Sequence, residues 1–322
     1  MLWEGEMRQQ LQTVLDVIGN TSLLRLRRLV PQSGARIFLK LENENPTGSM
    51  KDRMALAMIE AAEADGRLKP GGSIVEYTGG STGTSLALIS AVKGYRLHIV
   101  SSDAFTQEKL DHMRILGADL QIVPSDEGKM TEKLFRRMIE AARILQNGTG
   151  AYWTDQLNNS DQLSGYRSMG LEIWEQTGGA IDAFVQAVGT SASLRGNAET
   201  LRERNPQIKI VAVEPSESPV LSGGKRGAHK IDGIGTGFVP PLWRSEVVDR
   251  IEAVSTSDAV AMAIRLAREE GVFAGTSTGA NLTAAMRIAE ELDPSATVVT
   301  VMVDTGLKYL KNYKERRFLS VN

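Results

Sequence analysis

One lysine of this chain lies in a short segment whose residue types could support covalent chemistry on a carbonyl compound. The segment Pro46–Arg53 reads PTGSMKDR, and within it Ser49 and Asp52 have the spacing of a helix capping box. This spacing predicts that Lys51 lies in the first turn of a helix that continues through Arg53–Ala64. A cation there opposes the helix dipole by about 0.3–1 kcal/mol, which a solvated lysine simply tolerates. The functional alternative is a lowered pKa of the Lys51 ammonium, so that the neutral amine can form a Schiff base.

A second segment has the residue types of a phosphate-binding turn. The predicted strand Ala183–Val188 runs into the sequence GTSAS, and a helix is expected to begin near Leu194. Free backbone N–H groups and the dipole at such a helix start attract an anion. The simpler alternative is a turn whose serines only cap the helix. A Schiff-base lysine together with a separate phosphate site suggests pyridoxal phosphate as cofactor. The residues of this candidate phosphate site are Gly189, Thr190, Ser191, Ala192 and Ser193.

Three more glycine-rich clusters are Thr78–Gly83 (TGGSTG), Gly233–Gly237 (GIGTG) and Gly275–Gly279 (GTSTG). Thr78–Gly83 follows a predicted strand and precedes a helix, and ligands of open α/β sheets bind at the carboxyl ends of strands. The dinucleotide fingerprint G-x-G-x-x-G is not matched there, and Gly233–Gly237 lacks a strand–turn–helix context. The sequence G-x-x-x-x-G-K-[ST] does not occur either. A nucleotide site is therefore disfavoured.

Strands that alternate with helices must position these clusters. The predicted strands are Arg36–Leu41, Ser73–Thr78, Leu97–Ser101, Leu120–Val123, Ala183–Val188, Ile208–Val213 and Val298–Val303. The clearest helical patterns are Arg53–Ala64, Thr106–Leu116, Thr131–Leu145, Gln162–Glu175, Asp258–Glu270 and Asn281–Leu292. This alternation predicts βαβ units and parallel sheets, so the expected fold class is α/β.

Composition excludes several classes of protein. The 322 residues suggest roughly two domains. A net charge of −2 does not produce the positive electrostatic potential that attracts a polyanion, so nucleic acid is not an expected partner. Without cysteine, and with three histidines, the chain has no disulfides or thiolate nucleophile and no expected metal site. No run approaches the ~20 apolar residues of a membrane span, and we expect a cytoplasmic protein with no membrane partner.

Four motifs, spread in order over nearly the whole chain, carry a family resemblance. They are Ile18–Leu26 (IGNTSLLRL), Asn45–Arg53 (NPTGSMKDR), His229–Pro240 (HKIDGIGTGFVP) and Gly275–Ala280 (GTSTGA). They resemble segments of the cysteine synthases and cystathionine β-synthases, which are tryptophan-synthase-β-like (fold type II) pyridoxal phosphate enzymes. This resemblance implies two parallel-type α/β domains with the cofactor cleft between them, and a homodimer.

The implied domains divide the chain unevenly. A smaller α/β domain at residues 46–150 would carry Lys51 and the substrate-carboxylate loop. A larger domain, formed by residues 1–45 plus 151–322, would carry the phosphate loop. A soft boundary near Gln146–Ala151 (QNGTGA) agrees with this division, because glycine and polar residues separate two helix-rich stretches there.

The resemblance also implies a role for each matching residue. Lys51 would bind the cofactor covalently and later move the Cα proton, and Ser277 would hydrogen-bond the pyridine nitrogen. A neutral serine there delocalises less charge into the ring, which favours loss of a β-leaving group over transamination. Ser81 would lie near the cofactor 3′-oxygen. Gly189, Thr190, Ser191, Ala192 and Ser193 would bind the phosphate. The substrate carboxylate would be bound by Thr78, Gly79, Gly80 and Thr82, with help from Gln156.

The implied reaction is β-elimination from a β-substituted L-amino acid to an α-aminoacrylate, followed by addition of a small nucleophile. It is most like cysteine synthase, which joins O-acetylserine and sulfide. Departures from the family pattern lie close to these roles. Ser81 stands where an asparagine is usual, and Ser191 and Ala192 replace glycines. Gly165 stands where cysteine synthases commonly have a histidine.

Alternatives to the cysteine synthase reaction stay open at this point. Within enzymes they are a serine or threonine dehydratase-type β-elimination and a synthase of another β-substituted alanine. The alternatives without catalysis are a silent cofactor-binding homologue and, if no pyridoxal phosphate is bound, a plain nucleotide-binding domain.

Overall fold

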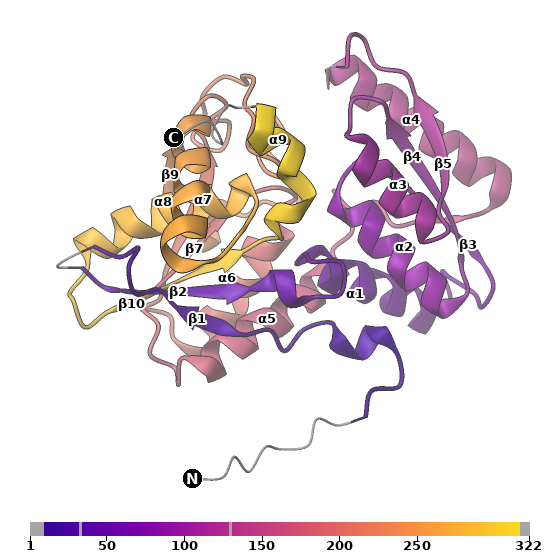
Figure 1. Ribbon diagram of the computed structural model, residues 1–322. Helices are drawn as coiled ribbons and strands as arrows, with labels where there is room; N and C mark the ends of the chain where they lie inside the picture. Colours follow the sequence, from indigo (N-terminus) through magenta and orange to yellow (C-terminus); the bar gives the residue numbers. More distant parts are fainter. Residues whose placement is uncertain (1–9, 32–33, 129–130, 316–322) are drawn as a thin grey trace.

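Two separate sheets, each covered by helices, organise the part of the chain that the computed structural model describes, residues 10–31, 34–128 and 131–315 (Figure 1). We call the portion around the four-stranded sheet the smaller half and the portion around the six-stranded sheet the larger half. The expected α/β class with parallel sheets is therefore present. No helix in the described ranges is long and apolar enough to cross a membrane.

The smaller half has an entirely parallel sheet in the order β5-β4-β3-β6. Its strands are β3 (Ser73–Tyr77), β4 (Arg96–Ser102), β5 (Asp119–Val123) and β6 (Tyr152–Trp153). Its helices are α2 (Ser81–Lys93), α3 (Gln107–Ile115) and α4 (Glu132–Thr149). Apolar side chains of α2 and α3 pack on one face of the sheet, and those of α4 pack on the other. Both faces are thus buried, as parallel sheets require.

The larger half has the strand order β1-β2-β10-β7-β8-β9, in which only β1 and β2 pair antiparallel. Its strands are β1 (Leu23–Arg25), β2 (Arg36–Leu41), β7 (Ala183–Ala187), β8 (Lys209–Pro215), β9 (Arg250–Val254) and β10 (Thr297–Met302). Helices α7 (Thr256–Glu270) and α8 (Thr276–Glu291) cover one face. Helices α5 (Gln162–Gln176) and α6 (Ala192–Arg204) cover the other. The short turn η4 (Gly306–Tyr309) and α9 (Leu310–Glu315) follow β10.

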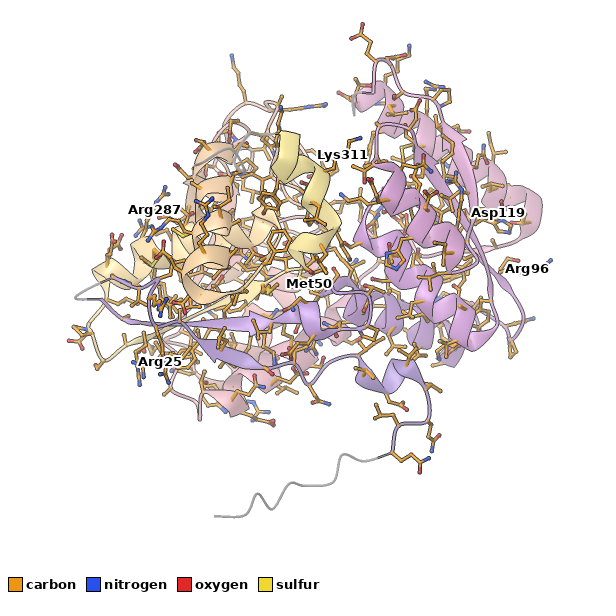
Figure 2. The ribbon with its side chains drawn as sticks, viewed as in Figure 1. Arg25, Met50, Arg96, Asp119, Arg287 and Lys311 are labelled. Carbon is orange, nitrogen blue, oxygen red and sulfur yellow. The ribbon has the colours of Figure 1, made fainter. Side chains whose placement is uncertain are left out.

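Helix α1 (Lys51–Ala64) joins the two halves. Its Met54 and Met58 belong to a core cluster of the larger half, whereas Ala55 and Ile59 belong to a cluster of the smaller half. Met50, directly before the helix, lies in the middle of the molecule (Figure 2). The helix that carries Lys51 is therefore held by packing on both sides.

The sequence predictions locate most of these elements. Each predicted strand is present within two residues of its expected ends. The short strands β1 and β6 and the strand β9 were not predicted. Residues 146–149 of the expected boundary form the last turn of α4, which ends at Gly150 with a φ of 66°. Strand β6, just beyond residue 150, pairs with β3 of the smaller half. The division into domains at residues 46 and 150 stays a prediction.

Candidate active site

A cavity of about 350 Å³ lies where the two halves meet, and most of the residues predicted from the sequence line it. Those that line it are Lys51, Thr78, Gly79, Gly80, Ser81, Thr82, Gln156, Gly189, Thr190 and Ser277. Ser191, Ala192 and Ser193 do not line this cavity, although they follow Gly189 and Thr190 directly. The loops after β3 and β7 and the start of α8 thus converge at the carboxyl ends of parallel strands.

Lys51 is the first residue of α1, as the sequence predicts, but the capping box does not form. The Asp52 carboxylate instead accepts hydrogen bonds from the Thr47 amide (2.8 Å), the Thr47 hydroxyl (2.6 Å) and the Ser85 hydroxyl (2.6 Å). The Asp52 side chain is held between the preceding loop, which contains Thr47, and α2, which contains Ser85. Asp52 therefore fixes the start of α1 to both the Thr47 loop and α2.

The environment of the Lys51 amine makes its neutral form more accessible than in a solvated lysine. Desolvation by burial lowers the pKa of Lys51 to about 8, the positive charge of Lys308 acts in the same direction, and the negative charge of Asp304 opposes both. Among the described residues, no side chain or backbone group hydrogen-bonds the Lys51 amine. A neutral, unengaged amine that faces a cavity is the form of lysine that attacks a carbonyl group.

Asp304, Lys308 and Tyr309, which follow strand β10, complete the charged surroundings of Lys51. The sequence analysis identified none of these three residues. Asp304 is 3% exposed and accepts a 2.6 Å hydrogen bond from the Tyr309 hydroxyl. Lys308 donates to the Ser81 hydroxyl at 3.2 Å, and the Ser81 hydroxyl donates to Asp304 at 3.4 Å. Burial raises the pKa of Asp304 and lowers the pKa of Lys308, while each charge opposes the shift of the other. The cluster connects Ser81 of the smaller half with the larger half.

The loop Thr78–Thr82 has a tightly fixed backbone. Gly79 lies against the Phe105 ring, which a Cβ atom at this position would overlap. The Thr82 hydroxyl donates to Gln156 Oε1 at 2.8 Å, and Gln156 Nε2 donates to the Tyr77 carbonyl at 3.2 Å. Gln156 thus holds the loop from the side on which the resemblance expects the substrate carboxylate.

A short series of hydrogen bonds links this loop to the candidate phosphate site. Gln162 Nε2 donates to the Gln156 carbonyl at 2.7 Å, and the Thr190 hydroxyl donates to Gln162 Oε1 at 3.2 Å. Gln162 is fully buried. The two loops therefore cannot shift independently without breaking one of these buried contacts.

In the turn before α6, a serine adopts a backbone conformation that is typical of glycine. Ser191 has a φ of 73°, in the left-handed region that a glycine would adopt with less strain. The Ser193 hydroxyl accepts from Gln186 Nε2 at 2.7 Å and so faces the protein interior. Gly189 has no room for a side chain, because a Cβ atom would lie 2.6 Å from the Gly233 carbonyl oxygen. The backbone N–H groups at the start of α6 are then donors that this turn can offer to an anion, whereas the Thr190 hydroxyl already donates its proton to Gln162.

Ser277, in the first turn of α8, is 1% exposed and lines the cavity. In the described part of the chain its hydroxyl has no hydrogen-bond partner, so it can bond a group placed in the cavity. The first turn of α8 contains no acidic residue. Any ring nitrogen held here would therefore meet a neutral hydroxyl instead of a carboxylate.

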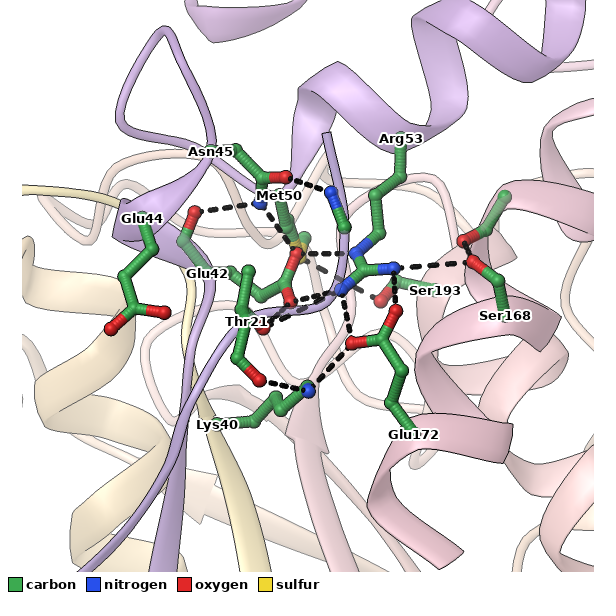
Figure 3. Close-up of polar contacts among 12 residues, drawn as sticks. Thr21, Lys40, Glu42, Glu44, Asn45, Met50, Arg53, Ser168, Glu172 and Ser193 are labelled. Atoms are coloured by element: carbon green, nitrogen blue, oxygen red, sulfur yellow. Dashed lines mark hydrogen bonds and ion pairs between the residues drawn. The ribbon is translucent and has the colours of Figure 1, made fainter. Parts of the chain in front are cut away.

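A buried ion network surrounds Arg53 in the first turn of α1 (Figure 3). Arg53 donates to Glu42 through Nε at 2.7 Å and through Nη2 at 2.9 Å, and it also pairs with Glu172 at 2.7 Å. Lys40 pairs with Glu172 at 2.6 Å. Burial would raise the pKa of Glu172, but hydrogen bonds and charges of Arg53 and Lys40 lower it to about 2. The network ties the first turn of α1 to β2 and α5.

Gly165, where the family commonly has a histidine, lies at the contact between α1 and α5. A Cβ atom there would overlap the backbone carbonyl of Arg53. A side chain at this position would require the two helices to separate. Gly165 does not line the cavity, and this departure therefore affects packing behind the site.

The residues around the cavity fit pyridoxal phosphate. Lys51 offers an amine of lowered pKa, Ser277 a hydroxyl for a ring nitrogen, and the Gly189–Thr190 turn donors for a phosphate. In the described ranges, no group of three or more histidine or acidic side chains could hold a metal ion.

Comparison with known proteins agrees with this geometry. The family model described as pyridoxal-phosphate dependent enzyme matches residues 14–304. The chain is 39% identical over 305 residues to a cysteine synthase of Staphylococcus aureus (strain N315), covering 94% of this chain and 96% of the relative. A cysteine synthase structure from Entamoeba histolytica superimposes with a TM-score of 0.91 at 35% identity, covering 98% of this chain and 94% of that one. A structure of O-ureido-L-serine synthase has a TM-score of 0.91 at 34% identity, covering 98% of both chains. The chain therefore belongs to the family of pyridoxal-phosphate-dependent enzymes.

Proposed function

We propose that the chain catalyses β-replacement on a β-substituted L-amino acid, as cysteine synthases do with O-acetylserine and sulfide. The observation that carries the proposal is the joint placement of Lys51, the Thr78–Thr82 loop and Ser277 in one cavity. Likeness to cysteine synthases over nearly the whole chain supports it. The pyridoxal phosphate cofactor, when bound, supplies an electron sink for the negative charge that develops at Cα.

Each proposed residue has a distinct task in this reaction. Lys51 would hold the cofactor, and its amine would take the Cα proton and later return it. Thr78, Gly79, Gly80 and Thr82 bind the substrate carboxylate, and Gln156 holds their loop through Thr82. The neutral Ser277 hydroxyl limits charge delocalisation into the ring, which favours departure of the β-substituent.

The cofactor is held by residues at either end of the cavity. Ser81, kept in place by Lys308 and Asp304, lies on the side of the Thr78–Thr82 loop. The backbone N–H groups of Gly189, Thr190, Ser191, Ala192 and Ser193 receive the phosphate.

A second candidate within the same chemistry is synthesis of another β-substituted alanine. The observation that favours it is Ser81 in place of the usual asparagine, with a hydrogen bond from the partly buried Lys308. Likeness to an O-ureido-L-serine synthase points the same way.

The test is the absorbance spectrum of the purified protein, followed by product analysis. A visible cofactor band that is lost in Lys51→Ala, and that changes on addition of O-acetylserine, is expected. Cysteine should then form when sulfide is added. A band that ignores O-acetylserine would refute this substrate, and formation of pyruvate and ammonia without a nucleophile would favour the dehydratase alternative.

We further propose that the chain acts as a homodimer in the cytoplasm. The family resemblance supports the dimer, and a chain without cysteine suits a reducing compartment. Light scattering at working concentration tests the dimer, and a molecular mass of one chain would refute it.

A further inference from the structure

A buried carboxylate close to the Thr78–Thr82 loop has no task in the reaction proposed above. Glu76 is the next-to-last residue of β3, is fully buried and does not line the cavity. Among the described residues, no lysine, arginine or histidine forms an ion pair with it. Burial of a carboxylate without a cation is unfavourable, so the groups that hydrogen-bond it indicate what it does.

Glu76 accepts three hydrogen bonds, and all three come from residues beside the substrate loop. Its Oε2 atom accepts from the Thr154 hydroxyl at 2.6 Å and from the Gln156 backbone N–H at 3.0 Å. Its Oε1 atom accepts from the Tyr77 backbone N–H at 2.9 Å. Backbone pairing between β3 and β6 stops at Trp153, so the Glu76 side chain continues the connection where the backbone ladder ends.

The backbone bends sharply between two of these donors. Asp155 has a φ of 45°, a conformation that is uncommon for residues other than glycine. Glu76 binds the residue on each side of it, Thr154 and Gln156, so the carboxylate fixes both ends of the bend. The direction in which the Gln156 side chain leaves the bend therefore depends on Glu76.

Gln156 transmits the position of the bend to the loop. Its backbone carbonyl accepts from Gln162, its Oε1 atom accepts from the Thr82 hydroxyl at 2.8 Å, and its Nε2 atom donates to the Tyr77 carbonyl at 3.2 Å. Both the backbone and the side chain of Gln156 are thus engaged. A shift of the bend cannot be absorbed at Gln156 without breaking one of these contacts, and the contact to Thr82 is the one that reaches the loop.

We propose that Glu76 is a positioning residue for the substrate carboxylate: its ionised form holds the bend at residues 154–156 and, through Gln156, fixes Thr82 in the Thr78–Thr82 loop. This inference rests on the proposed function, which assigns that loop to the substrate carboxylate. The ionised carboxylate accepts from all three donors at full strength. A proton on Oε2 weakens the acceptor for the Gln156 amide, and a proton on Oε1 weakens the acceptor for the Tyr77 amide. Protonation therefore loosens the bend.

The surroundings of Glu76 set the pH at which this happens. Burial raises the pKa of Glu76 to about 7, the three hydrogen bonds oppose this shift, and the negative charge of Asp155 adds to it. Glu76 lies on the face of β3 that packs on α1 and α2. Lys51 on α1 faces the cavity, and Arg96 on β4 is exposed. The other titratable side chains of α1, α2, β4 and β6 have partners elsewhere, namely Asp52, Arg53, Glu60, Glu63, Lys93, His98 and Tyr152.

The experiment measures how tightly the holoenzyme binds L-alanine, which carries the carboxylate and the amine but no β-leaving group. The dissociation constant is obtained from the change in cofactor absorbance at pH values from about 5.5 to about 9. Wild-type affinity should increase about 10-fold as the pH rises through about 7, because the ionised Glu76 then holds the loop. The amine of L-alanine ionises in the same way with every variant, so differences between variants report the protein.

Glu76→Gln keeps the shape of the side chain but cannot ionise. At about pH 8 it should bind L-alanine about 10-fold less tightly than wild type does, and its affinity should have no transition near pH 7. Its cofactor absorbance should persist. With O-acetylserine and sulfide its KM should rise while kcat stays nearly the same, because ground-state binding of the carboxylate is lost. Glu63→Gln is the matched control, since Glu63 pairs with Lys93 outside the cavity, and it should behave as wild type does.

Two further variants should move the transition in opposite directions. Thr154→Val removes a hydrogen bond that stabilises the ionised Glu76, so the midpoint should move to higher pH. Asp155→Asn removes the neighbouring negative charge, so the midpoint should move to lower pH. Asparagine also tolerates the positive φ at this position, which preserves the bend. These two variants test the inference even if Glu76→Gln does not fold.

The possible failures are distinguishable. Wild-type affinity and an unchanged transition in Glu76→Gln would overturn the inference, and so would midpoints that stay in place in Thr154→Val and Asp155→Asn. Loss of the cofactor band together with the affinity would overturn it too, because Glu76 would then support the fold in general. Affinities that follow these expectations, without formation of cysteine from O-acetylserine and sulfide, would refute the proposed reaction and leave the inference standing. No binding of L-alanine and no turnover of O-acetylserine would overturn both together.

Discussion

The Lys308 ammonium donates a 3.2 Å hydrogen bond to the Ser81 hydroxyl, from the larger half of the molecule to the smaller one. A partly buried cation therefore supports the side chain that replaces the usual asparagine of the family. The same cation acts on Lys51, because its charge lowers the pKa of the Lys51 amine. The substitution at Ser81 and the reactivity of Lys51 are thus connected through one residue that the recognised motifs do not contain.

Lys308→Met should raise the pKa of Lys51 above its value of about 8, since a neighbouring positive charge is removed. Only the neutral amine attacks a carbonyl group, so the rate at which apoenzyme captures pyridoxal phosphate reports this pKa. We expect the midpoint of the rate–pH curve to move to higher pH in Lys308→Met and to stay in place in Lys308→Arg. Equal midpoints in wild type and Lys308→Met would refute the electrostatic link.

Arg53→Met should destabilise the fold strongly. It leaves the buried Glu42 and the largely buried Glu172 without their main cation, and loss of one partner of a buried pair costs about 3–5 kcal/mol. Urea unfolding measures the change in free energy. The control is Arg67→Met, which removes surface pairs to Asp65 and Asp161 and should cost about 1 kcal/mol or less. Similar losses in the two variants would contradict this view of the network.

Glu76 should make the protein less stable as the pH rises. Burial raises its pKa to about 7, while hydrogen bonds from Thr154, Gln156 and Tyr77 oppose this and Asp155 adds to it. The folded state therefore binds a proton more tightly than the unfolded chain, whose Glu76 has a pKa near 4.5. Stability from this group is present below about pH 4.5 and is lost as the pH rises through about 7.

The measurement for Glu76 is urea unfolding at about pH 5 and about pH 8. Wild type should lose on the order of 3 kcal/mol more between these conditions than Glu76→Gln does. Glu175→Gln, at an exposed position, should keep the wild-type pH dependence. The assignment fails if Glu76→Gln and wild type have the same pH dependence.

Gly79→Ala should displace the proposed carboxylate loop, because its Cβ atom would overlap the Phe105 ring. A displacement of about 1 Å can lower kcat/KM about 100-fold. Cofactor binding, followed by its absorbance, should persist because Lys51 and the phosphate turn are elsewhere. Gly80→Ala is the matched comparison, since nothing lies within 4 Å of its Cβ position, and its loss should be much smaller. Equal losses would show that the Phe105 contact does not position the loop.

Local patterns in the sequence predict seven of the ten strands in the described residues, the start of α1 and the glycine-rich turns, because each depends on residues close together in the chain. The same patterns miss Asp304 and Lys308, which lie more than 200 residues from Ser81 and look like ordinary polar residues after a strand. Asp304 and Lys308 come close to Lys51 only because the end of β10 lies next to the smaller half in the folded molecule. The extent of α8 was also underestimated, because its first turn, Thr276–Gly279, is rich in glycine and threonine and lacks an amphipathic pattern.

The capping-box prediction gave the correct start of helix α1 from a contact that does not form. Ser49 and Asp52 have the right spacing, yet the Asp52 carboxylate accepts its hydrogen bonds from Thr47 and Ser85 instead. Helix α1 still begins at Lys51, since its packing against both halves fixes it. Tertiary contacts here override a local preference without moving the helix boundary.

The strand order places β10, the last strand made, between β2 and β7 in the middle of the larger sheet. During synthesis β2 can pair with β1 at once, but its other neighbour, β10, exists only when almost the whole chain has emerged, whereas β3 to β6 form a contiguous stretch that can pair early. Asp304 and Lys308 follow β10 directly, so the surroundings of Lys51 are completed last. A truncated or stalled chain that ends before β10 would thus carry the reactive lysine and its motif without the environment that makes the amine reactive.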